Sequence, residues 1–357
     1  MSGGVDSSVA AALLKEEGYE VTGVFMKVWD ERMPCSSTCS KPACYGPEGK
    51  DLSDVRQVAE ILGIKLLVID LAAEYEATVL DYFRKEYLKG RTPNPCIICN
   101  RFLKFGLLPE RAASSTGISF DFFATGHYAL TGKNKKTGRY FIKKGVDSGK
   151  DQSYFLFLLT QQQLSGLMLP LGGYTKKQVR SLAKKYRLQV EEKEESQDFI
   201  SGDRLFLFSN GVKEGPVTDK NGNILGRHKG IVNYTVGQRK GLGIASGKPL
   251  YVTSIDAEKN TIILGEKKDV YKKELSAGNL NLVSVNEITT SMKIEAKVRY
   301  KHAAAPAVID TPDGKGIFSV RFEKPQWAVT PGQAVVFYHA DEVLGGGFIS
   351  HVHQPLK

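Results

Sequence analysis

The first two hundred or so residues alternate between short apolar runs and segments with helical periodicity. Helical patterns cover residues 8–17, 52–62, 73–88 and a stretch from about residue 100, whereas residues 20–28 and the runs KLLVID and FDFFATGH are typical of strands. Gly18 and Gly63 are expected to end the first two helices, and Asp51 is a candidate cap of the second. Repeated strand–helix units imply a parallel sheet covered on both faces, with ligands beyond the carboxyl ends of its strands.

The chain opens with MSGGVDSSVAAALL, a glycine-rich turn directly before a helical pattern. Glycine lets a backbone approach an anion, serine hydroxyls donate hydrogen bonds, and a helix N-terminus is partly positive, so the turn suits a phosphate. A plain helix cap is the alternative reading. The spacing and lysine of a Walker A loop are absent. A central strand would normally feed such a turn, and we expect that this first strand is missing from the sequence.

The charge balance favours a polyanionic partner without requiring one. The 357 residues are enough for two or three domains, and 49 Lys and Arg against 39 Asp and Glu give a net charge of +10. No apolar run approaches the roughly 18 residues of a membrane helix, and no secretory signal is visible. We therefore expect a cytoplasmic protein with no membrane partner.

Changes in composition and in apolar patterning along the sequence divide the chain into three predicted domains. Residues 1–202 carry the alternating pattern, and residues 203–272, rich in glycine and basic side chains, form a small middle domain. Within it, LYVTSIDAEKNTIILG is typical of a hairpin. Residues 273–357 contain runs such as KIEAKVRY and GIFSVRF, which predict a compact antiparallel β-barrel.

All five cysteines lie before residue 100, and their odd number argues against a disulfide framework. Cys96 and Cys99 form a C-x-x-C at a predicted helix start, where the helix dipole favours the thiolate. A structural zinc site is the alternative, but no second C-x-x-C or histidine pair supports it. Cys35, Cys39 and Cys44 lie together in MPCSSTCSKPACYG, a loop broken by proline and glycine.

Motifs along nearly the whole chain resemble, in order, those of the tRNA-specific 2-thiouridylases of the PP-loop ATP pyrophosphatase superfamily. These are SGGVDSS, TPNPCIICNRFLKFG, ATGHYA, KDQSYFL, HKGIVNYTVGQRKGLGIA and PQWAVTPGQAVVFY. The resemblance implies a parallel-sheet α/β PP-loop domain, a small middle domain and a C-terminal antiparallel barrel. It also implies an enzyme that adenylates the C2 oxygen of the wobble uridine of tRNA, position 34, and replaces it with sulfur, releasing AMP and pyrophosphate.

The same resemblance implies a nucleotide site. The pyrophosphate of ATP would lie in a loop made of Ser2, Gly3, Gly4, Val5, Asp6, Ser7 and Ser8. Asp6 would act through Mg²⁺, Met26 would lie against the adenine, and Gly126 would close the site. The plainer interpretation makes Met26 a buried strand residue.

Contacts with the anticodon arm of tRNA are implied as well. They are assigned to Asn94 and Pro95 beside the target base, to His127, to Lys150, Asp151 and Gln152, to Arg299 and Tyr300, and to Gln333. The basic GQRKG run suits phosphate approach. For each basic residue the alternative is a solvated surface charge, and for His127 it is a structural hydrogen bond.

The sulfur chemistry departs from the family pattern. Cys99 matches the family's catalytic cysteine, but Cys96 stands where many members have aspartate, and Ile200 lies at or near the position of a second, relay cysteine. We therefore expect a [4Fe–4S] cluster held by Cys96, Cys99 and one of Cys35, Cys39 and Cys44, fed by a donor protein or free sulfide. Zinc in the loop and a persulfide on Cys99 are the competitors.

Two other functions remain open on the sequence alone. One is a PP-loop adenylating enzyme of another kind, such as a thiolase acting at a different tRNA position. The other is a non-catalytic tRNA-binding relative, consistent with the missing relay cysteine, although the intact SGGVDSS argues against it.

Overall fold

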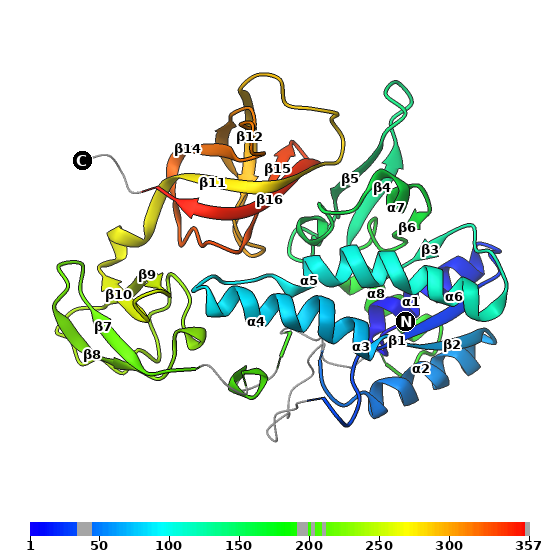
Figure 1. Cartoon of the computed structure of the whole chain (residues 1–357). Coiled ribbons are helices and arrows are strands. Elements are labelled where there is room, and N and C mark those ends of the chain that lie inside the picture. The colour runs from blue at the N-terminus through cyan, green and yellow to red at the C-terminus, as the bar shows by residue number, and fades with distance from the viewer. Residues whose placement is uncertain (34–44, 191–198, 201–203, 209–211, 354–357) are drawn as a thin grey trace. The chain divides into compact units, whose positions relative to one another are not determined.

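The computed structural model describes residues 1–33, 45–190, 199–200, 204–208 and 212–353 (Figure 1). Cys35, Cys39 and Cys44 lie outside these ranges. The chain divides into two compact units. Unit 1 comprises Met1–Val79, Cys96–Asp203 and Asp341–Val343, and unit 2 comprises Leu80–Pro95, Arg204–Ala340 and Leu344–Lys357. No helix within the described ranges is both long and apolar enough to cross a membrane.

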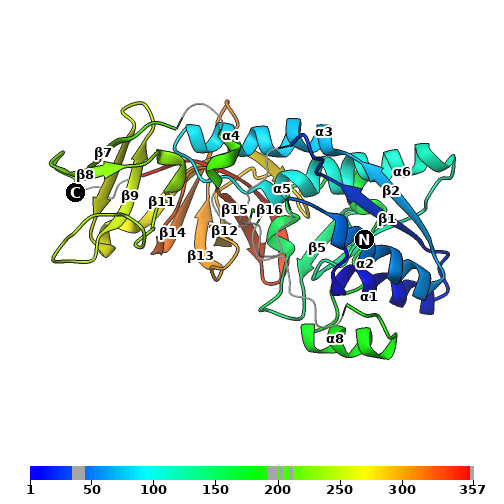
Figure 2. The same ribbon diagram turned by 90° about the horizontal axis from the view of Figure 1, so that it is seen from below.

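Unit 1 contains two separate parallel strand pairs, which confirms the predicted α/β class. Strand β1 (Thr22–Lys27) pairs with β2 (Lys65–Asp70) (Figure 2), and β3 (Phe123–Ala124) pairs with β6 (Leu167–Met168) (Figure 1). In the part of the chain that the structure describes, no strand joins the two pairs. The strand predicted over FDFFATGH, with its end in a loop at Gly126, is only two residues long, and the loop at Gly126 is confirmed.

Helix α1 (Val5–Glu16) is deeply buried along its middle. Every residue from Val9 to Leu14 is buried, so the alanine-rich run packs closely on its neighbours. These neighbours are α2 (Gly49–Leu62) and α8 (Lys176–Lys185), whose Val58 and Val179 share one core with Val9. The helix that carries the opening loop is thus held on several sides.

The predicted helix ends of α1 and α2 are confirmed, and one predicted start is wrong. Gly18 has φ +89°, and Gly63 is the left-handed C-cap of α2. The N-cap of α2 is Glu48, not Asp51, which lies in the first turn. Pro47 directly precedes this cap, so the cap lies three residues before the predicted one, and Asp51 favours the helix from inside its positive end.

Two longer helical runs include π-helical segments. The first runs through α3 (Ala72–Tyr75), η1 (Glu76–Leu80) and α4 (Asp81–Leu88). The second runs through α5 (Pro95–Ile98), η2 (Cys99–Leu107) and α6 (Leu108–Thr116), so it begins before the predicted residue 100. Proline at its first position favours that earlier start, because its φ is already helical.

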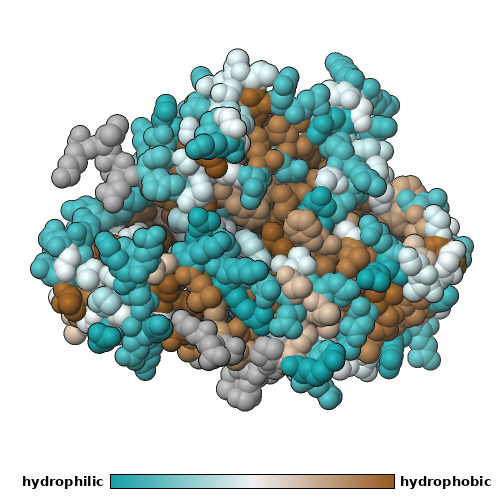
Figure 3. Space-filling model, in the orientation of Figure 1, coloured by the Kyte–Doolittle hydropathy of each residue, from teal (hydrophilic) through white to brown (hydrophobic). Residues whose placement is uncertain are grey.

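The remaining elements of unit 1 are short. A hairpin joins β4 (Ala129–Lys133) and β5 (Tyr140–Lys144), followed by η3 (Ser153–Phe155) and α7 (Gln161–Ser165). The face in Figure 3 mixes hydrophilic and hydrophobic side chains. Among the exposed apolar residues of unit 1, Tyr19 and Phe122 meet edge to face with ring centroids 6.4 Å apart.

The middle part of unit 2 is a four-stranded sheet in the order β8-β7-β10-β9. Its strands are β7 (Gly215–Thr218), β8 (Ile224–His228), β9 (Tyr251–Asp256) and β10 (Thr261–Gly265). The predicted hairpin is confirmed, because β9 and β10 pair antiparallel. Short 3-10 helices η4 (Arg204–Leu207), η5 (Ile231–Asn233) and η6 (Lys267–Val270) flank the sheet in sequence.

The C-terminal strands form the predicted closed antiparallel barrel. They are β11 (Tyr271–Leu282), β12 (Met292–Lys297), β13 (Ala305–Ile309), β14 (Phe318–Trp327), β15 (Ala334–His339) and β16 (Glu342–Val352). The order is β11-β14-β13-β12-β15-β16, and β16 pairs back onto β11. Phe318, Phe322 and Phe337 fill the interior of the closed barrel.

Candidate functional site

The opening loop forms a tight turn at the N-terminus of α1. Gly3 has φ +72°, and a Cβ there would lie 2.8 Å from the carbonyl oxygen of Asp51. The Ser7 and Ser8 hydroxyls donate to the Gly4 carbonyl at 3.2 and 3.0 Å. The turn therefore requires glycine at position 3 and lies directly against the backbone of α2.

Gly126, which the motif assignment gives as closing the nucleotide site, packs on the same turn. A Cβ at this position would lie 2.6 Å from the carbonyl carbon of Asp6 and 2.8 Å from the amide nitrogen of Ser7. Any larger residue would push the loop after β3 away from α1. The structure thus brings residue 126 to the stretch 2–8 across a long sequence separation.

Asp6 is surrounded by groups that the sequence did not reveal. Lys176 Nζ lies 2.7 and 2.9 Å from the two carboxylate oxygens, and the Tyr128 hydroxyl donates to Oδ1 at 2.7 Å. The Lys176 side chain is only 12% exposed. It is the first residue of α8, whose start is fixed by a capping box between Thr175 and Gln178. A cation is therefore held beside the glycine turn.

Glu48, the N-cap of α2, has a shifted pKa. Both oxygens of Glu48 accept from the Val28 amide, at 3.2 and 3.1 Å. Burial raises the pKa of Glu48 to about 7, against the opposing effect of these backbone hydrogen bonds. Near neutral pH this carboxyl is therefore often uncharged, which limits the negative charge near an anion site.

Met26 lies within β1 and not in the loop after it. Its half-buried side chain packs against the cluster around Ile69, Leu71 and Leu108. The structure is compatible with either interpretation of this methionine, the adenine contact or the buried strand residue.

His127 follows Gly126 and is held by its neighbours. Its Nδ1 lies 2.8 Å from the Thr125 hydroxyl, and its ring is 5.6 Å from that of Phe105. Desolvation, together with the charge of Lys104, lowers the pKa of His127 well below its ordinary value. The ring is therefore neutral at physiological pH and can offer a hydrogen bond but not a charge.

Cys96 and Cys99 lie at the start of the second helical run, as predicted. Cys96 is in the short α5, and Cys99 begins the π-helix η2; both are partly exposed and neither is in a disulfide within the described residues. Residues three apart on a helix share a face. π-helical segments are frequent at functional sites.

Two backbone carbonyls of the π-helix η2 accept hydrogen bonds from a glutamine that is distant in the sequence. Gln163 Nε2 donates to the carbonyls of Arg101 and Phe105 at 2.8 and 2.9 Å. Asn100 is buried and donates to the Phe155 carbonyl at 3.3 Å. The segment that carries Cys99 is therefore held by side chain to backbone bonds on both sides.

Two of the residues assigned to tRNA in KDQSYFL have structural partners. Asp151 is buried and accepts from the amides of Gly145 and Ser153, at 3.2 and 3.1 Å. Gln152 Oε1 accepts from the Tyr128 amide at 3.0 Å, so it supports the residue that contacts Asp6. The backbone amide of the third residue, Lys150, donates to the Asp147 carbonyl.

The assigned residues of unit 2 also have inward contacts. Asn94 is 9% exposed and Pro95 is buried. Arg299 Nη2 donates to the Val236 carbonyl at 2.8 Å, and Gln333 Nε2 donates to the Thr92 carbonyl at 2.9 Å. Tyr300, which follows Arg299, lies under the Lys297 ammonium at 5.5 Å.

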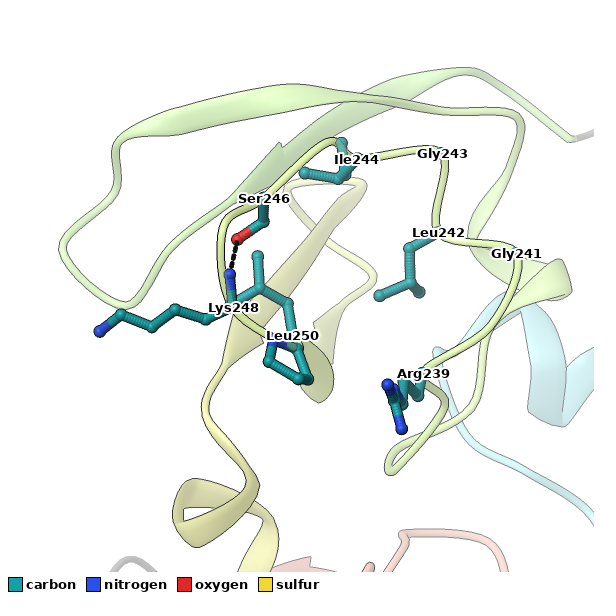
Figure 4. A pocket seen from close by; sticks show the side chains of 9 residues that line it. Arg239, Gly241, Leu242, Gly243, Ile244, Ser246, Lys248 and Leu250 are labelled. Atoms are coloured by element: carbon teal, nitrogen blue, oxygen red, sulfur yellow. Dashed lines mark hydrogen bonds between the residues drawn. The ribbon is translucent and has the colours of Figure 1, made fainter.

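The basic glycine-rich run forms a pocket of about 350 Å³ in the middle domain (Figure 4). Arg239 and Lys248 contribute positive charge and Leu242 is a buried part of its wall. Lys248 pairs with Glu266 at 3.2 Å. This loop is suited to an anionic strand, although nothing in the sequence indicated a pocket.

Comparison with known families covers nearly the whole chain. Residues 1–201 match the tRNA methyl transferase HUP domain, residues 208–266 the tRNA methyl transferase PRC-barrel domain, and residues 272–349 the Aminomethyltransferase beta-barrel domain. The three matches follow the order of the parallel-sheet region, the middle sheet and the barrel.

Individual relatives show the same relationship. The chain is 47% identical over 351 residues to the tRNA-specific 2-thiouridylase MnmA of Endomicrobium trichonymphae, covering 98% of this chain and 97% of the relative. It is 47% identical over 362 residues to the protein of that name from Acetivibrio thermocellus, with coverage of 98% and 97%. For the protein from Carboxydothermus hydrogenoformans the identity is 46% over 358 residues, with coverage of 98% and 96%. The chain therefore belongs to the tRNA-specific 2-thiouridylase family.

Proposed function

We propose that this protein catalyses the ATP-dependent 2-thiolation of the wobble uridine, position 34, of tRNA, and releases AMP and pyrophosphate. The observation that carries the proposal is the glycine turn at the start of α1, where Asp6 is paired with Lys176 at 2.7 Å. Family membership, with relatives named as tRNA-specific 2-thiouridylases, supports the substrate. The reaction takes place in the cytoplasm, on the anticodon arm of tRNA.

The turn has the properties that a bound triphosphate requires. A Cβ at Gly3 or at Gly126 would meet backbone at 2.8 or 2.6 Å, so both positions keep the backbone close around the site. The partly positive N-terminus of α1 and the ammonium of Lys176 compensate phosphate charge. Asp6 is the residue that would hold Mg²⁺, a hard cation that prefers carboxylate oxygen. When bound, this ion supplies further charge compensation to the leaving pyrophosphate.

The chemistry proceeds in two displacements. First the uridine O2 attacks the α-phosphorus of ATP, and the bond from that phosphorus to the β-phosphate bridging oxygen breaks, releasing pyrophosphate. Sulfur then attacks C2, and the C2–O bond breaks with AMP as the leaving group. Lys176 and the α1 N-terminus act in the first displacement, because negative charge accumulates there on the departing pyrophosphate. Cys99, on η2, belongs to the second.

Sulfur delivery requires ligands in addition to the two helix cysteines. We propose a [4Fe–4S] cluster held by Cys96, Cys99 and one cysteine of the loop that contains positions 35, 39 and 44. Within the described residues no three Cys, His, Asp or Glu side chains gather at one point, and the three loop cysteines lie outside these residues. A bound cluster with an open iron would present sulfide, taken from a donor protein or from free sulfide.

Two described segments that are distant in the sequence contact each other. Tyr45, which follows Cys44 in the chain, donates its amide to the Phe199 carbonyl at 3.2 Å, and their rings stack with centroids 6.4 Å apart. Phe199 directly precedes Ile200, which stands at or near the family's relay cysteine.

Two measurements test the proposal. Mass spectrometry of tRNA nucleosides from a deletion strain should show loss of 2-thiouridine at position 34; loss of a thionucleoside at another position, or no loss, points to the other two functions. The purified protein with tRNA and ATP should release AMP and pyrophosphate, and release of ADP with phosphate would contradict it.

The cluster is tested separately from the overall reaction. Anaerobically isolated protein should contain iron and absorb near 400 nm (roughly, as thiolate-bound iron does), and Cys96→Ala should lose both iron and thiolation. Fully active protein without iron, together with an active Cys96→Ala variant, would instead leave Cys99 as the carrier of a persulfide.

A further inference from the structure

The loop of residues 91–95, here called the target loop, is fixed by the barrel. The Gln333 side-chain amide Nε2 donates to the carbonyls of Thr92 and Pro93, at 2.9 and 3.3 Å. The Thr92 amide donates in turn to the Pro331 carbonyl at 2.9 Å. Three hydrogen bonds therefore connect this loop to a single turn of the barrel.

The barrel turn leaves no space between itself and the target loop. Gly332 has φ +89°, and a Cβ there would lie 3.0 Å from Arg91 Cβ and from both the nitrogen and the oxygen of Thr92. The turn is itself fixed, because the Gly332 amide donates to the Ile349 carbonyl at 2.8 Å. Close approach and a left-handed backbone both require glycine here.

Arg299 connects the same turn to the middle domain. Its Nη2 donates to the Val236 carbonyl at 2.8 Å and to the Thr330 hydroxyl at 2.5 Å. Thr330 is buried and begins the turn that Gln333 ends. On the middle-domain side, Gly237 approaches so closely that a Cβ would lie 2.6 Å from the Cβ of Ala328. Barrel, middle domain and target loop therefore meet in one hydrogen-bonded junction.

We propose that Gln333 and Arg299 are positioning residues that hold the target loop in place for the uridine. Gln333 Nε2 is engaged by two carbonyls of the loop, and Arg299 Nη2 by two oxygens beside it, so each of these nitrogens spends its donors on the junction. The inference rests on the proposed function for its catalytic consequence. From Pro95 the chain enters α5, which carries Cys96, so a displaced target loop changes the approach to the cysteines.

The decisive variant is Gln333→Glu, which keeps the side-chain size but replaces the amide donor with a carboxylate that two carbonyls repel. Gln326→Glu is the matched control, because Gln326 is a partly exposed barrel residue whose amide donates to the nearby Lys324 carbonyl. We expect Gln333→Glu to lower kcat about tenfold to a hundredfold, as misplacement of a reacting group does. The tRNA Kd should stay within about twofold of that of Gln326→Glu, which carries the same added charge.

Hydrogen exchange in the protein without tRNA gives a readout that needs no catalysis. The Thr92 amide should exchange about tenfold or more faster in Gln333→Glu than in the control, because its loop is released. If tRNA affinity falls tenfold while Thr92 exchange is unchanged, Gln333 is a tRNA ligand and the proposal is wrong. Faster exchange with unchanged kcat also overturns it. If the unmodified protein shows no thiolation, the proposed function fails, and the exchange result still decides whether Gln333 fixes the loop.

Arg299→Lys provides a second test that does not depend on the folding of the glutamate variant. Lysine keeps the positive charge that would attract phosphate, but its shorter side chain does not place a nitrogen where Nη2 donates to both Val236 and Thr330. We expect a lowered kcat with an unchanged tRNA Kd. An unchanged kcat in this variant would contradict the positioning role.

Discussion

The glycine turn in unit 1 and the target-loop junction in unit 2 are built from opposite kinds of sequence information. Most of the turn comes from one continuous stretch, residues 2–8, whose residue types already suit a phosphate. The junction is built from Thr92, Val236, Arg299 and Gln333, which the sequence separates widely. The residue types of a contiguous motif indicate which ligand it binds. The role of a residue in a dispersed junction can be inferred only once its hydrogen-bond partners are known.

The comparison predicts that damage to the turn stops the first chemical step without affecting RNA binding. Asp6→Ala should reduce tRNA-dependent pyrophosphate release by about 10³-fold, because the Mg²⁺ ligand is lost and Lys176 is left without its counter-charge. The tRNA Kd should change by less than about twofold. Pyrophosphate release is measured with a coupled assay, and Asp121→Ala, an exposed aspartate of the same unit, is the control. Pyrophosphate release near the unmodified level would remove Asp6 from the site.

Lys176 provides the next largest effect, and it tests a residue for which the sequence gave no functional signal. Lys176→Met should lower the rate of pyrophosphate release about 10²-fold, because charge on the leaving group is no longer compensated. Lys176→Arg should recover part of that loss by restoring a cation. The neighbouring, exposed Lys177→Met serves as the control. Equal rates for the Lys176 and Lys177 methionine variants would show that the ion pair with Asp6 is only structural.

The glycine turn and the target-loop junction can be compared by substituting one glycine in each, Gly126 and Gly332. Gly126→Ala forces a contact of 2.6 Å on the turn, and Gly332→Ala forces 3.0 Å on the target loop with an unfavourable φ. Each should cost about 1–3 kcal/mol of stability, as overpacking does. Gly126→Ala should weaken ATP binding, measured by calorimetry, and leave Thr92 exchange unchanged, whereas Gly332→Ala should do the reverse. Similar profiles for the two variants would remove the distinction between the regions.

Much of the fold followed from local signals. The helix ends at Gly18 and Gly63 could be predicted because a glycine after an apolar pattern has few other roles. The antiparallel barrel and the β9–β10 hairpin followed from alternation and turn residues. The loop at Gly126 was predicted, but the length of the strand before it was overestimated, because an apolar run does not reveal how many of its residues pair in a sheet.

The site was less predictable, for a physical reason that Lys176 illustrates. The sequence around Lys176 predicts only a capped helix start, because its partner Asp6 is 170 residues away. Asp151 shows the converse, since a charged residue in a recognised motif turned out to be buried and to bind backbone amides. Pairings of this kind depend on how elements pack, and a single sequence carries no direct signal for them.

The smallest expected effect concerns Glu48, and it tests whether the environment of the turn disfavours negative charge. Its folded pKa is about 7, above the ordinary 4.5, because burial disfavours the carboxylate. A raised folded pKa means that stability is fully present below about pH 4.5 and is lost as the pH rises to about 7. Glu48→Gln removes this titration. The variant should therefore gain stability over the unmodified protein as the pH rises, by roughly 1–2 kcal/mol once partial solvent screening is taken into account.

The measurement is the difference in unfolding free energy between Glu48→Gln and the unmodified protein at pH 5 and pH 8. The difference is used because His127 acts in the opposite sense: its lowered pKa makes its contribution to stability disappear as the pH falls below its ordinary 6.5. That contribution is common to both proteins and cancels. A difference that does not change between the two pH values would mean that Glu48 titrates normally. The region around the turn would then carry a full negative charge at neutral pH, and anion binding would depend more strongly on Lys176 and the N-terminus of α1.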